Sequence, residues 1–253
     1  MLNQEVYELN RNAPFECLHG DSLRLLQQLP DNSFDAVITD PPYSSGGMTH
    51  GQRTSAPEQK YLNNANSKYP TFVGDNKDVR SWQFWSTLWM SECLRVCKPG
   101  GYILSFTDWR MLPSTTDVLQ ASGFIWRGVI AWDKTNSSRA PHKGYFRHQC
   151  EYVVWGTKGA AIKAHWGGPW PGCISERVKP KEKFHMTGKP VPVMRHLVQC
   201  VPPGGKILDP FMGSGSTGVA ALLEDREFVG IEMSDEYFAI STARLNETLD
   251  NRR

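Results

Sequence analysis

The sequence lacks the features of two large classes of protein. No apolar run approaches the roughly 18 residues that a membrane-spanning helix needs. Residues 1–5 have neither the basic nor the apolar part of a secretory signal. The six cysteines contain no C-x-x-C pair, which disfavours a structural zinc ion and predicts reduced thiols. We therefore expect a cytoplasmic protein with no membrane partner and no bound metal.

The pattern G-x-x-x-x-G-K-S/T is also absent, which excludes a phosphate-cradling NTPase loop. The chain has 253 residues, of which 40% are hydrophobic and 21% are charged, and this composition is ordinary for a globular core. It contains no internal repeat. We expect a single domain over residues 1–253.

Two of the cysteines, Cys93 and Cys97, lie four residues apart in an apolar stripe with Trp82, Trp85 and Trp89. Because this spacing is helical, we interpret all five side chains as core. The alternatives, metal ligands and base-stacking platforms, are less consistent with a helical stripe.

Charge is distributed unevenly along the chain. The net charge is only +2, yet residues Lys134 to Lys189 contain 11 Lys or Arg and three acidic residues, which leaves −6 for the rest. Aromatic residues such as Tyr145 and Phe146 are interleaved with the basic ones. This pattern suits contact between one face and a polyanion. A solvated loop region would give the same composition, so charge alone does not decide.

Short apolar runs alternate with helical patterns, which predicts a parallel sheet flanked by helices. Residues 44–80 form a long polar stretch, and loops of this length are usually functional. The helices are expected near 21–29, 82–96, 111–121, 190–200, from 216 and from 235. The seven expected strands are Phe15–His19, Phe34–Thr39, Tyr102–Thr107, Phe124–Trp132, Cys150–Trp155, Lys206–Leu208 and Phe228–Glu232.

A glycine-rich turn, residues 209–218, lies between a strand and a helix. Gly213 and Gly215 allow the backbone to approach a ligand closely, and the helix that follows presents free N–H groups. Asp209 could meet an ammonium group, and Glu232, at the end of the next strand, could accept both hydroxyls of a ribose. The turn therefore indicates a nucleoside cofactor.

Gly213, Gly215 and Gly218 also match G-x-G-x-x-G, the pattern of dinucleotide-binding oxidoreductases. Two observations disfavour that class. The turn begins with the acidic Asp209, and only one strand follows it, so the paired nucleotide-binding halves are missing.

The tetrapeptide Asp40-Pro41-Pro42-Tyr43 directly follows the strand that ends at Thr39. Residues beyond the carboxyl ends of parallel strands line the ligand site of open α/β sheets. Since proline has no N–H, Asp40 and the Pro41 carbonyl remain as acceptors that can hold an exocyclic amino group of adenine or cytosine. Two such hydrogen bonds would free the nitrogen lone pair for attack on a sulfonium methyl group. Tyr43 would stack on the base. The alternative is an ordinary turn opened by Asp-Pro.

Together these residues resemble the amino-methyltransferases that transfer a methyl group from S-adenosylmethionine to adenine N6 or cytosine N4 of DNA. The tetrapeptide precedes the cofactor motif, which resembles the permuted, beta arrangement of that family. The motifs that carry the resemblance are Gly20-Asp21, Asp40 to Tyr43, Leu94 to Gly101, His185 to Pro190, Asp209 to Thr217, and Glu232.

The resemblance implies an α/β fold: one seven-stranded, mostly parallel sheet with helices on both faces and one antiparallel edge strand. The hairpin of residues 124–155 would supply that edge. It also implies that catalysis acts on a target base flipped out of the stack. The catalytic residues would be Asp40, Pro41, Pro42 and Tyr43.

The same resemblance implies the residues that bind S-adenosylmethionine, with Glu232 on the ribose and Asp21 on the adenine amino group. In the segment 185–190, Met186 and Gly188 replace the Pro and Gln of the family's usual His-Pro-Thr-Gln-Lys-Pro. The full expected set is Asp21, Thr187, Lys189, Asp209, Phe211, Gly213, Gly215, Ser216, Thr217 and Glu232.

The expected partner is double-stranded DNA, bound by a monomer or a homodimer, with residues 44–80 and 134–184 as target-recognition regions. Because Asp heads the tetrapeptide, adenine N6 is favoured over cytosine N4. A catalytically silent nucleic-acid-binding protein and an RNA or small-molecule methyltransferase remain as alternatives. Phosphate contacts are expected from Lys143, Arg147, Lys179, Lys181 and Lys183.

Overall fold

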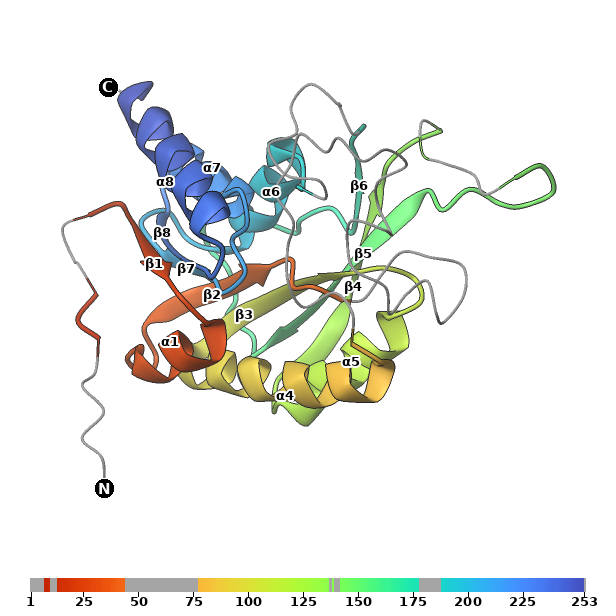
Figure 1. Ribbon diagram of the computed structural model, residues 1–253, viewed down its shortest axis with the longest axis horizontal. Coiled ribbons are helices and arrows are strands. Elements are labelled where there is room, and N and C mark those ends of the chain that lie inside the picture. Colours follow the sequence, from red (N-terminus) through yellow and green to blue (C-terminus); the bar gives the residue numbers. More distant parts are fainter. Residues whose placement is uncertain are drawn as a thin grey trace.

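A computed structural model describes residues 7–9, 13–43, 77–136, 138, 142–177 and 188–252. These residues form one eight-stranded sheet in the order β1-β8-β7-β2-β3-β5-β4-β6, with helices on both faces (Figure 1). The strands are β1 Phe15–His19, β2 Phe34–Thr39, β3 Cys97–Thr107, β4 Ile125–Asp133, β5 Cys150–Thr157, β6 Cys173–Ser175, β7 Lys206–Asp209 and β8 Glu227–Glu232. The helices are α1 Ser22–Gln28, α4 Val79–Val96, α5 Leu112–Ala121, α6 Val191–Leu197, α7 Ser216–Leu223 and α8 Asp235–Asp250, with a 3-10 turn, η2, at Val198–Cys200.

The sheet separates two hydrophobic cores. Val37 of β2 points into the core that α1, α4 and α5 cover, whereas its neighbours Ala36 and Ile38 point into the core beneath α6, α7 and α8. Successive side chains of a strand point to opposite faces, so a central strand buried on both faces must be apolar throughout. This explains the apolar run of residues 36–38 in the middle of β2. Within the described residues, no helix is long and apolar enough to cross a membrane.

The predicted fold class is confirmed, since all seven expected strands form and most pair in parallel. The strand count was wrong by one. The additional strand, β6, pairs with β4 and contains only three residues, of which Cys173 and Ser175 are exposed. A strand this short, with one buried side chain, has no alternating pattern for a sequence argument to detect.

The antiparallel strand of the sheet is β5, and its position also differs from the prediction. It pairs with β3 on one side and β4 on the other, so β4 and β6, not β5, lie toward the edge. After β3 the chain passes through α5 to β4, which is separated from β3 by the width of one strand. The β4–β5 hairpin then places β5 between β3 and β4. The hairpin is therefore on the expected side of the sheet, with its reversed strand internal.

The tryptophan stripe belongs to α4, and the core interpretation is confirmed. Trp82, Trp89 and Cys93 are fully buried, Trp85 is partly buried, and Cys97 is buried where β3 begins. The helix starts at an N-cap, Asp78, whose carboxylate accepts hydrogen bonds from the backbone N–H groups of residues 80 and 81.

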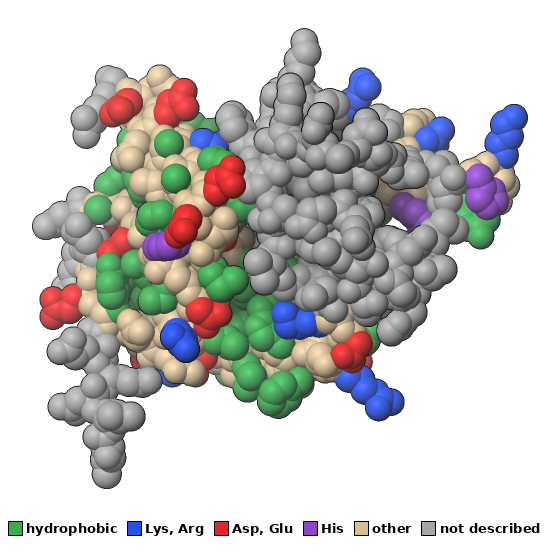
Figure 2. Space-filling view, in the orientation of Figure 1, with side chains coloured by type: hydrophobic (Ala, Val, Ile, Leu, Met, Phe, Trp, Pro, Cys, Tyr) green, Lys and Arg blue, Asp and Glu red, His purple; other side chains and the backbone are tan. Residues whose placement is uncertain are grey.

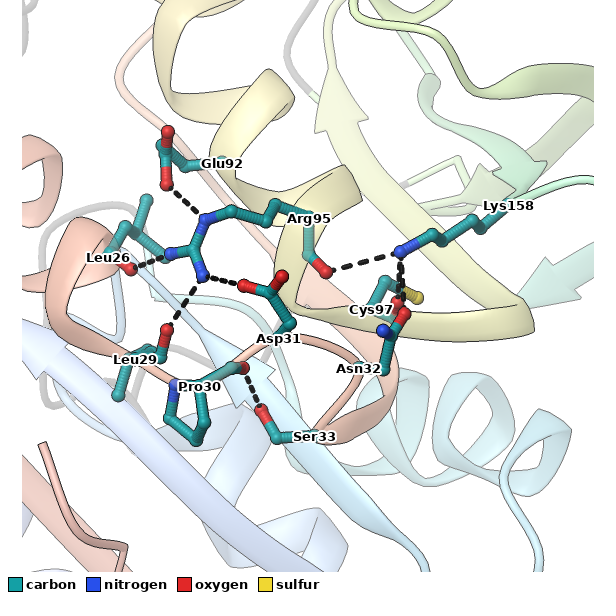
Figure 3. Close-up of polar contacts among 10 residues, drawn as sticks. All are labelled: Leu26, Leu29, Pro30, Asp31, Asn32, Ser33, Glu92, Arg95, Cys97 and Lys158. Atoms are coloured by element: carbon teal, nitrogen blue, oxygen red, sulfur yellow. Dashed lines mark hydrogen bonds and ion pairs between the residues drawn. The ribbon is translucent and has the colours of Figure 1, made fainter. Parts of the chain in front are cut away.

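Where α4 ends, a polar network ties the elements together (Figure 3). The Arg95 guanidinium donates to the carbonyl oxygens of Leu26 and Leu29 at 2.7 and 2.8 Å and to Glu92 at 2.8 Å. Lys158 donates to the carbonyl oxygen of Cys97 at 2.8 Å. This network lies where β2 and β3 begin. The carboxyl ends of the parallel strands therefore lie on the opposite side of the sheet, at the other end of the strands.

Candidate active site

The carboxyl ends of β2 and β7 are neighbours. The two strands pair in parallel, with Val37 opposite Leu208. The hydroxyl of Thr39, the last residue of β2, donates a 2.7 Å hydrogen bond to Oδ1 of Asp209, the last residue of β7. The tetrapeptide that begins at Asp40 and the glycine-rich loop that begins after Asp209 therefore start side by side, as the sequence predicts.

Asp209 holds this junction together. Its Oδ1 also accepts from the backbone N–H of Phe211 at 3.1 Å, and its Oδ2 accepts from the Thr217 hydroxyl at 2.6 Å. The side chain is buried, and burial raises its pKa to about 6 against the hydrogen bonds from Thr217 and Thr39, which lower it. Since both carboxylate oxygens accept hydrogen bonds within the chain, the first role of Asp209 is to shape the loop.

The loop makes two left-handed turns, at Gly213 with φ of +50° and at Gly215 with φ of +80°. Side chains are strained in this region of backbone space, so glycine is required. Gly218, in contrast, serves packing, because a Cβ there would lie 2.6 Å from Phe228 and 2.7 Å from Leu245. The third glycine of the G-x-G-x-x-G pattern thus seats α7 against β8 and α8.

Glu232, the last residue of β8, lies beside the glycine loop. Its carboxylate accepts hydrogen bonds from the backbone N–H of Gly213 at 2.9 Å and of Ser234 at 2.8 Å. Burial raises its pKa, while these backbone donors lower it. The adjacent strand β1 ends at His19, opposite Glu232, and is followed by Asp21, an exposed residue that caps α1. Both expected nucleoside contacts therefore come from neighbouring strand ends.

Phe211 is half-buried between the loop and α4. Its ring centroid is 5.4 Å from that of Trp85 and 5.1 Å from that of Trp89. The carbonyl oxygen of Pro210 accepts a hydrogen bond from Ser22 of α1. Ser216 and Thr217 open α7, with Gly215 as its N-cap. The loop is thus fixed on two sides by elements that the sequence places far away.

The tetrapeptide packs against α4. The carbonyl oxygen of Pro42 accepts a hydrogen bond from the indole of Trp82 at 2.8 Å, and Tyr43 is 9% exposed and belongs to the same core. Asp40 forms an ion pair with Lys189, whose ammonium lies 5.8 Å from the centroid of the Tyr43 ring. The proposed base-stacking ring is therefore largely covered in this structure.

Lys189 was expected beside the cofactor, and the structure places it against the carboxylate of Asp40. It directly precedes the Pro190 N-cap of α6 and is buried. Its ammonium pairs with Asp40 and lies 3.5 Å from Oε2 of Glu151. Burial lowers the pKa of Lys189, but Asp40 and Glu151 together outweigh burial and raise it. The two carboxylates therefore favour the charged form of Lys189.

Glu151 and its partner Lys134 are site residues that the sequence analysis missed. The Lys134 ammonium donates to Oε1 of Glu151 at 2.9 Å. Burial raises the pKa of Glu151, but the charges of Lys189 and Lys134 dominate and lower it. The rule that ligand sites follow the carboxyl ends of parallel strands does not point to the first residues of a strand. Because β5 is reversed, it brings its first residues to that edge, with Tyr152 opposite Thr107. One signal was present: Glu151 is the only charged residue of β5.

The remaining expected site residues fall into two groups. Lys143 and Arg147 are exposed in the loop between β4 and β5, which extends away from the body (Figure 1). Figure 2 shows Lys, Arg and His side chains on this loop. No group of three or more metal-ligating side chains occurs in the part of the chain that the structure describes. Thr187, Lys179, Lys181, Lys183 and residues 44–76 of the polar stretch lie outside the described residues.

Comparison with known proteins agrees with this geometry. Residues 34–243 match the model of the N6_N4_Mtase family, described as DNA methylase. The chain belongs to this DNA methylase family. The protein YubD of Escherichia coli (strain K12) is 31% identical to this methylase over 229 residues, which cover 90% of this chain and 88% of YubD. The type II methyltransferase M2.LlaDCHI of Lactococcus lactis subsp. cremoris is 29% identical over 250 residues, which cover 91% of this chain and 88% of that protein.

Solved structures share the fold of this methylase. M1.HpyAVI, in a complex with S-adenosylmethionine, superposes with a TM-score of 0.65 at 24% identity over 92% of this chain and 99% of that one. The PvuII DNA methyltransferase, which is cytosine-N4-specific, superposes with a TM-score of 0.69 at 18% identity over 94% and 91%. The methyl donor of the family is S-adenosylmethionine, which is bound in the M1.HpyAVI complex. The carboxylates of Glu232 and Asp21 and the glycine turn are donor and acceptor groups that fit a nucleoside with an amino-acid tail.

Proposed function

We propose that the protein transfers a methyl group from S-adenosylmethionine to the exocyclic N6 of adenine in double-stranded DNA, at specific sites. The observation that supports this most is the hydrogen bond between Thr39 and Asp209, which joins the Asp40 tetrapeptide to the glycine loop. A methyl donor on the loop and an amino group on the tetrapeptide would meet at this junction. Direct displacement needs both within van der Waals reach.

The cofactor, when bound, supplies a methyl group on a positively charged sulfur. Glu232 would accept hydrogen bonds from the ribose hydroxyls, and Asp21 would accept one from the adenine amino group. The backbone N–H groups at the start of α7 would attract the carboxylate of the methionine end. Lys189 and Thr187 were also expected in this set, and the pairing of Lys189 with Asp40 gives that lysine a second task.

On the DNA side, Asp40 and the carbonyl oxygen of Pro41 would accept the two hydrogens of the target amino group. These acceptors stand at fixed positions because prolines 41 and 42 restrict the backbone and Trp82 holds the Pro42 carbonyl. Lys189 stabilises the ionised form of Asp40. Asp40 therefore acts as a hydrogen-bond acceptor and electrostatic partner at the nitrogen, where positive charge develops during transfer.

Asp at the head of the tetrapeptide supports adenine as the target. Cytosine N4 is the alternative, because its exocyclic amino group offers the same two hydrogens and the PvuII enzyme shares the fold. In either case the amino group is inside the duplex, so the base must leave the stack to reach Asp40.

The loop between β4 and β5 suits contact with the DNA around that base. It carries Lys143, Arg147 and the fully exposed ring of Phe146. No acidic residue occurs between Asp133 and Glu151. The ring of Trp109, which follows β3, stacks on His148 at 5.6 Å between centroids. The base of the loop therefore lies beside the carboxyl end of β3, near the proposed catalytic site.

The test is a transfer assay with labelled S-adenosylmethionine and DNA, RNA or no polymer, followed by digestion to nucleosides. The expected product is N6-methyldeoxyadenosine, formed from DNA only. Label in N4-methyldeoxycytidine would overturn the choice of adenine but not the activity. Absence of label in any polymer, with the cofactor still bound, would favour the silent binding protein.

A further inference from the structure

Four charged side chains of alternating sign form a row that begins at the catalytic tetrapeptide and continues to the start of β5. Asp40 pairs with Lys189, Lys189 lies 3.5 Å from Glu151, and Glu151 pairs with Lys134 at 2.9 Å. They come from the end of β2, the segment before α6, the start of β5 and the residue after β4. We call these four residues the charge row.

The charge row is poorly accessible to water. The side chain of Lys189 is only 5% exposed, and those of Glu151 and Lys134 are 20% and 19% exposed. An ammonium at this depth is stable only if carboxylates neutralise it. Asp40 alone would balance Lys189, yet Asp40 is also the group that must attract the target nitrogen. Glu151 supplies a second carboxylate to the same ammonium, at 3.5 Å.

This second carboxylate matters for the chemistry of transfer. During displacement, positive charge moves from the sulfur of the donor to the amino nitrogen, next to Asp40. The two carboxylates and two ammonium groups of the charge row sum to zero. If Glu151 were neutral, the row would carry a net positive charge close to the nitrogen, and that charge would oppose the transition state more than the ground state.

We propose that Glu151 is a positioning residue for methyl transfer: it holds Lys189 against Asp40 and balances the charge of the lysine, so that Asp40 remains an effective acceptor. This inference rests on the proposed function of Asp40. It assigns to the reversed strand β5 a role at the site that the parallel strands cannot fill, because only a reversed strand brings its first residues to this edge.

The experiment compares Glu151→Gln with the wild type in single turnover and steady state, with saturating DNA and S-adenosylmethionine. We expect the transfer rate to fall by about 10- to 100-fold, because an unbalanced unit charge acts over several ångströms in a partly buried site. The KM values for both substrates should change by less than about threefold, since Glu151 is placed to affect the transition state. An unchanged rate would overturn the inference.

The matched control is Glu224→Gln. Glu224 also has a lowered pKa and pairs with Arg195, but it follows α7, at the other edge of the sheet. The Glu224→Gln variant should transfer the methyl group at the wild-type rate. If both variants lose activity equally, loss of an ion pair anywhere in the fold explains the result, and the inference is wrong.

A second change separates charge balance from structural damage. Adding Lys134→Met to Glu151→Gln returns the row to zero net charge, and we expect it to recover at least half of the lost rate on a logarithmic scale. Glu151→Asp, which keeps the charge, should retain most of the activity and tests the idea even if Glu151→Gln folds poorly. A double variant as slow as Glu151→Gln would contradict the role in charge balance. If the wild type itself transfers no methyl group, the proposed function fails, which is a distinct result.

Discussion

The hydroxyl of Thr39 donates its hydrogen bond to the buried carboxylate of Asp209, a residue 170 positions away along the chain. Each is the last residue of its strand, and the two strands are neighbours in the sheet. Together with the pairing of β2 and β7, this contact brings the start of the Asp40 tetrapeptide beside the start of the glycine loop. Both motifs therefore begin at the ends of neighbouring strands.

Asp209 should make stability depend on pH. Its pKa is raised to about 6 by burial, whereas an aspartate in an unfolded chain titrates near 3.9. Between about pH 4 and 6 the folded state retains a proton that the unfolded state releases, so the free energy of unfolding falls as pH rises. Relative to Asp209→Asn, the wild type should lose about 2–3 kcal/mol across this window. Urea unfolding of both proteins at pH 4, 5, 6 and 7 measures it, and a constant difference would contradict the raised pKa.

Arg95 should be the strongest single contributor to stability at the edge away from the site. Its guanidinium satisfies two carbonyl oxygens at the end of α1 and two carboxylates (Figure 3). Arg95→Met removes the side-chain donor from the Leu29 carbonyl and one of two donors from the Leu26 carbonyl, which keeps the backbone N–H of Leu29, and should lower the free energy of unfolding by about 1–3 kcal/mol. The control is Arg195→Met, which removes a largely exposed ion pair and should cost less than about 1 kcal/mol. Equal losses in urea unfolding would show that the carbonyl contacts contribute little.

The sequence located the tetrapeptide and the glycine loop because parallel strands bring their carboxyl ends to one edge. Motifs that directly follow two such strands must therefore lie near each other, and Asp40 and Asp209 do. The same rule missed Glu151, because nothing in a strand's own composition tells which way it runs in the sheet. The direction of β5 is decided by the hairpin and by the crossover through α5, and these are properties of the whole fold.

Packing roles were equally hard to anticipate. Gly218 matches a ligand-binding pattern, yet its lack of a side chain is required by Phe228 and Leu245. Lys189 belongs to a motif associated with the cofactor, yet its ion pair is with Asp40. In both cases the motif singles out the residue, but its partner becomes known only from the three-dimensional structure.

The basic side chains of the β4–β5 loop should contribute to DNA affinity through phosphate contacts. We expect Lys143→Gln and Arg147→Gln each to reduce the slope of log K against log salt by about 0.9, the release of one counterion. Fluorescence anisotropy with a labelled duplex between 50 and 200 mM salt gives that slope. Lys98→Gln, which removes a partly exposed lysine where β3 begins, is the control. A slope unchanged from the wild type in all three variants would remove the loop from the DNA interface.

Phe146 should contact DNA by stacking. Its ring is 95% exposed on the same loop, and an aromatic ring this exposed among basic residues suits an unstacked base step. Phe146→Ala should weaken binding of the duplex by about 5- to 150-fold, the value of one stacking contact. The matched control is Trp126→Ala, because Trp126 is 44% exposed at the opposite end of β4. Equal affinities for the Phe146 variant and the wild type would contradict this contact.

The most direct measurement is single-turnover methyl transfer by Asp40→Asn, with cofactor affinity determined on the same preparation. If Asp40 holds the target amino group while the glycine loop holds the donor, the variant should bind S-adenosylmethionine within about threefold of the wild type and transfer the methyl group at least about 100-fold more slowly. Transfer at the wild-type rate, with the cofactor bound normally, would show that the end of β2 does not carry the chemistry.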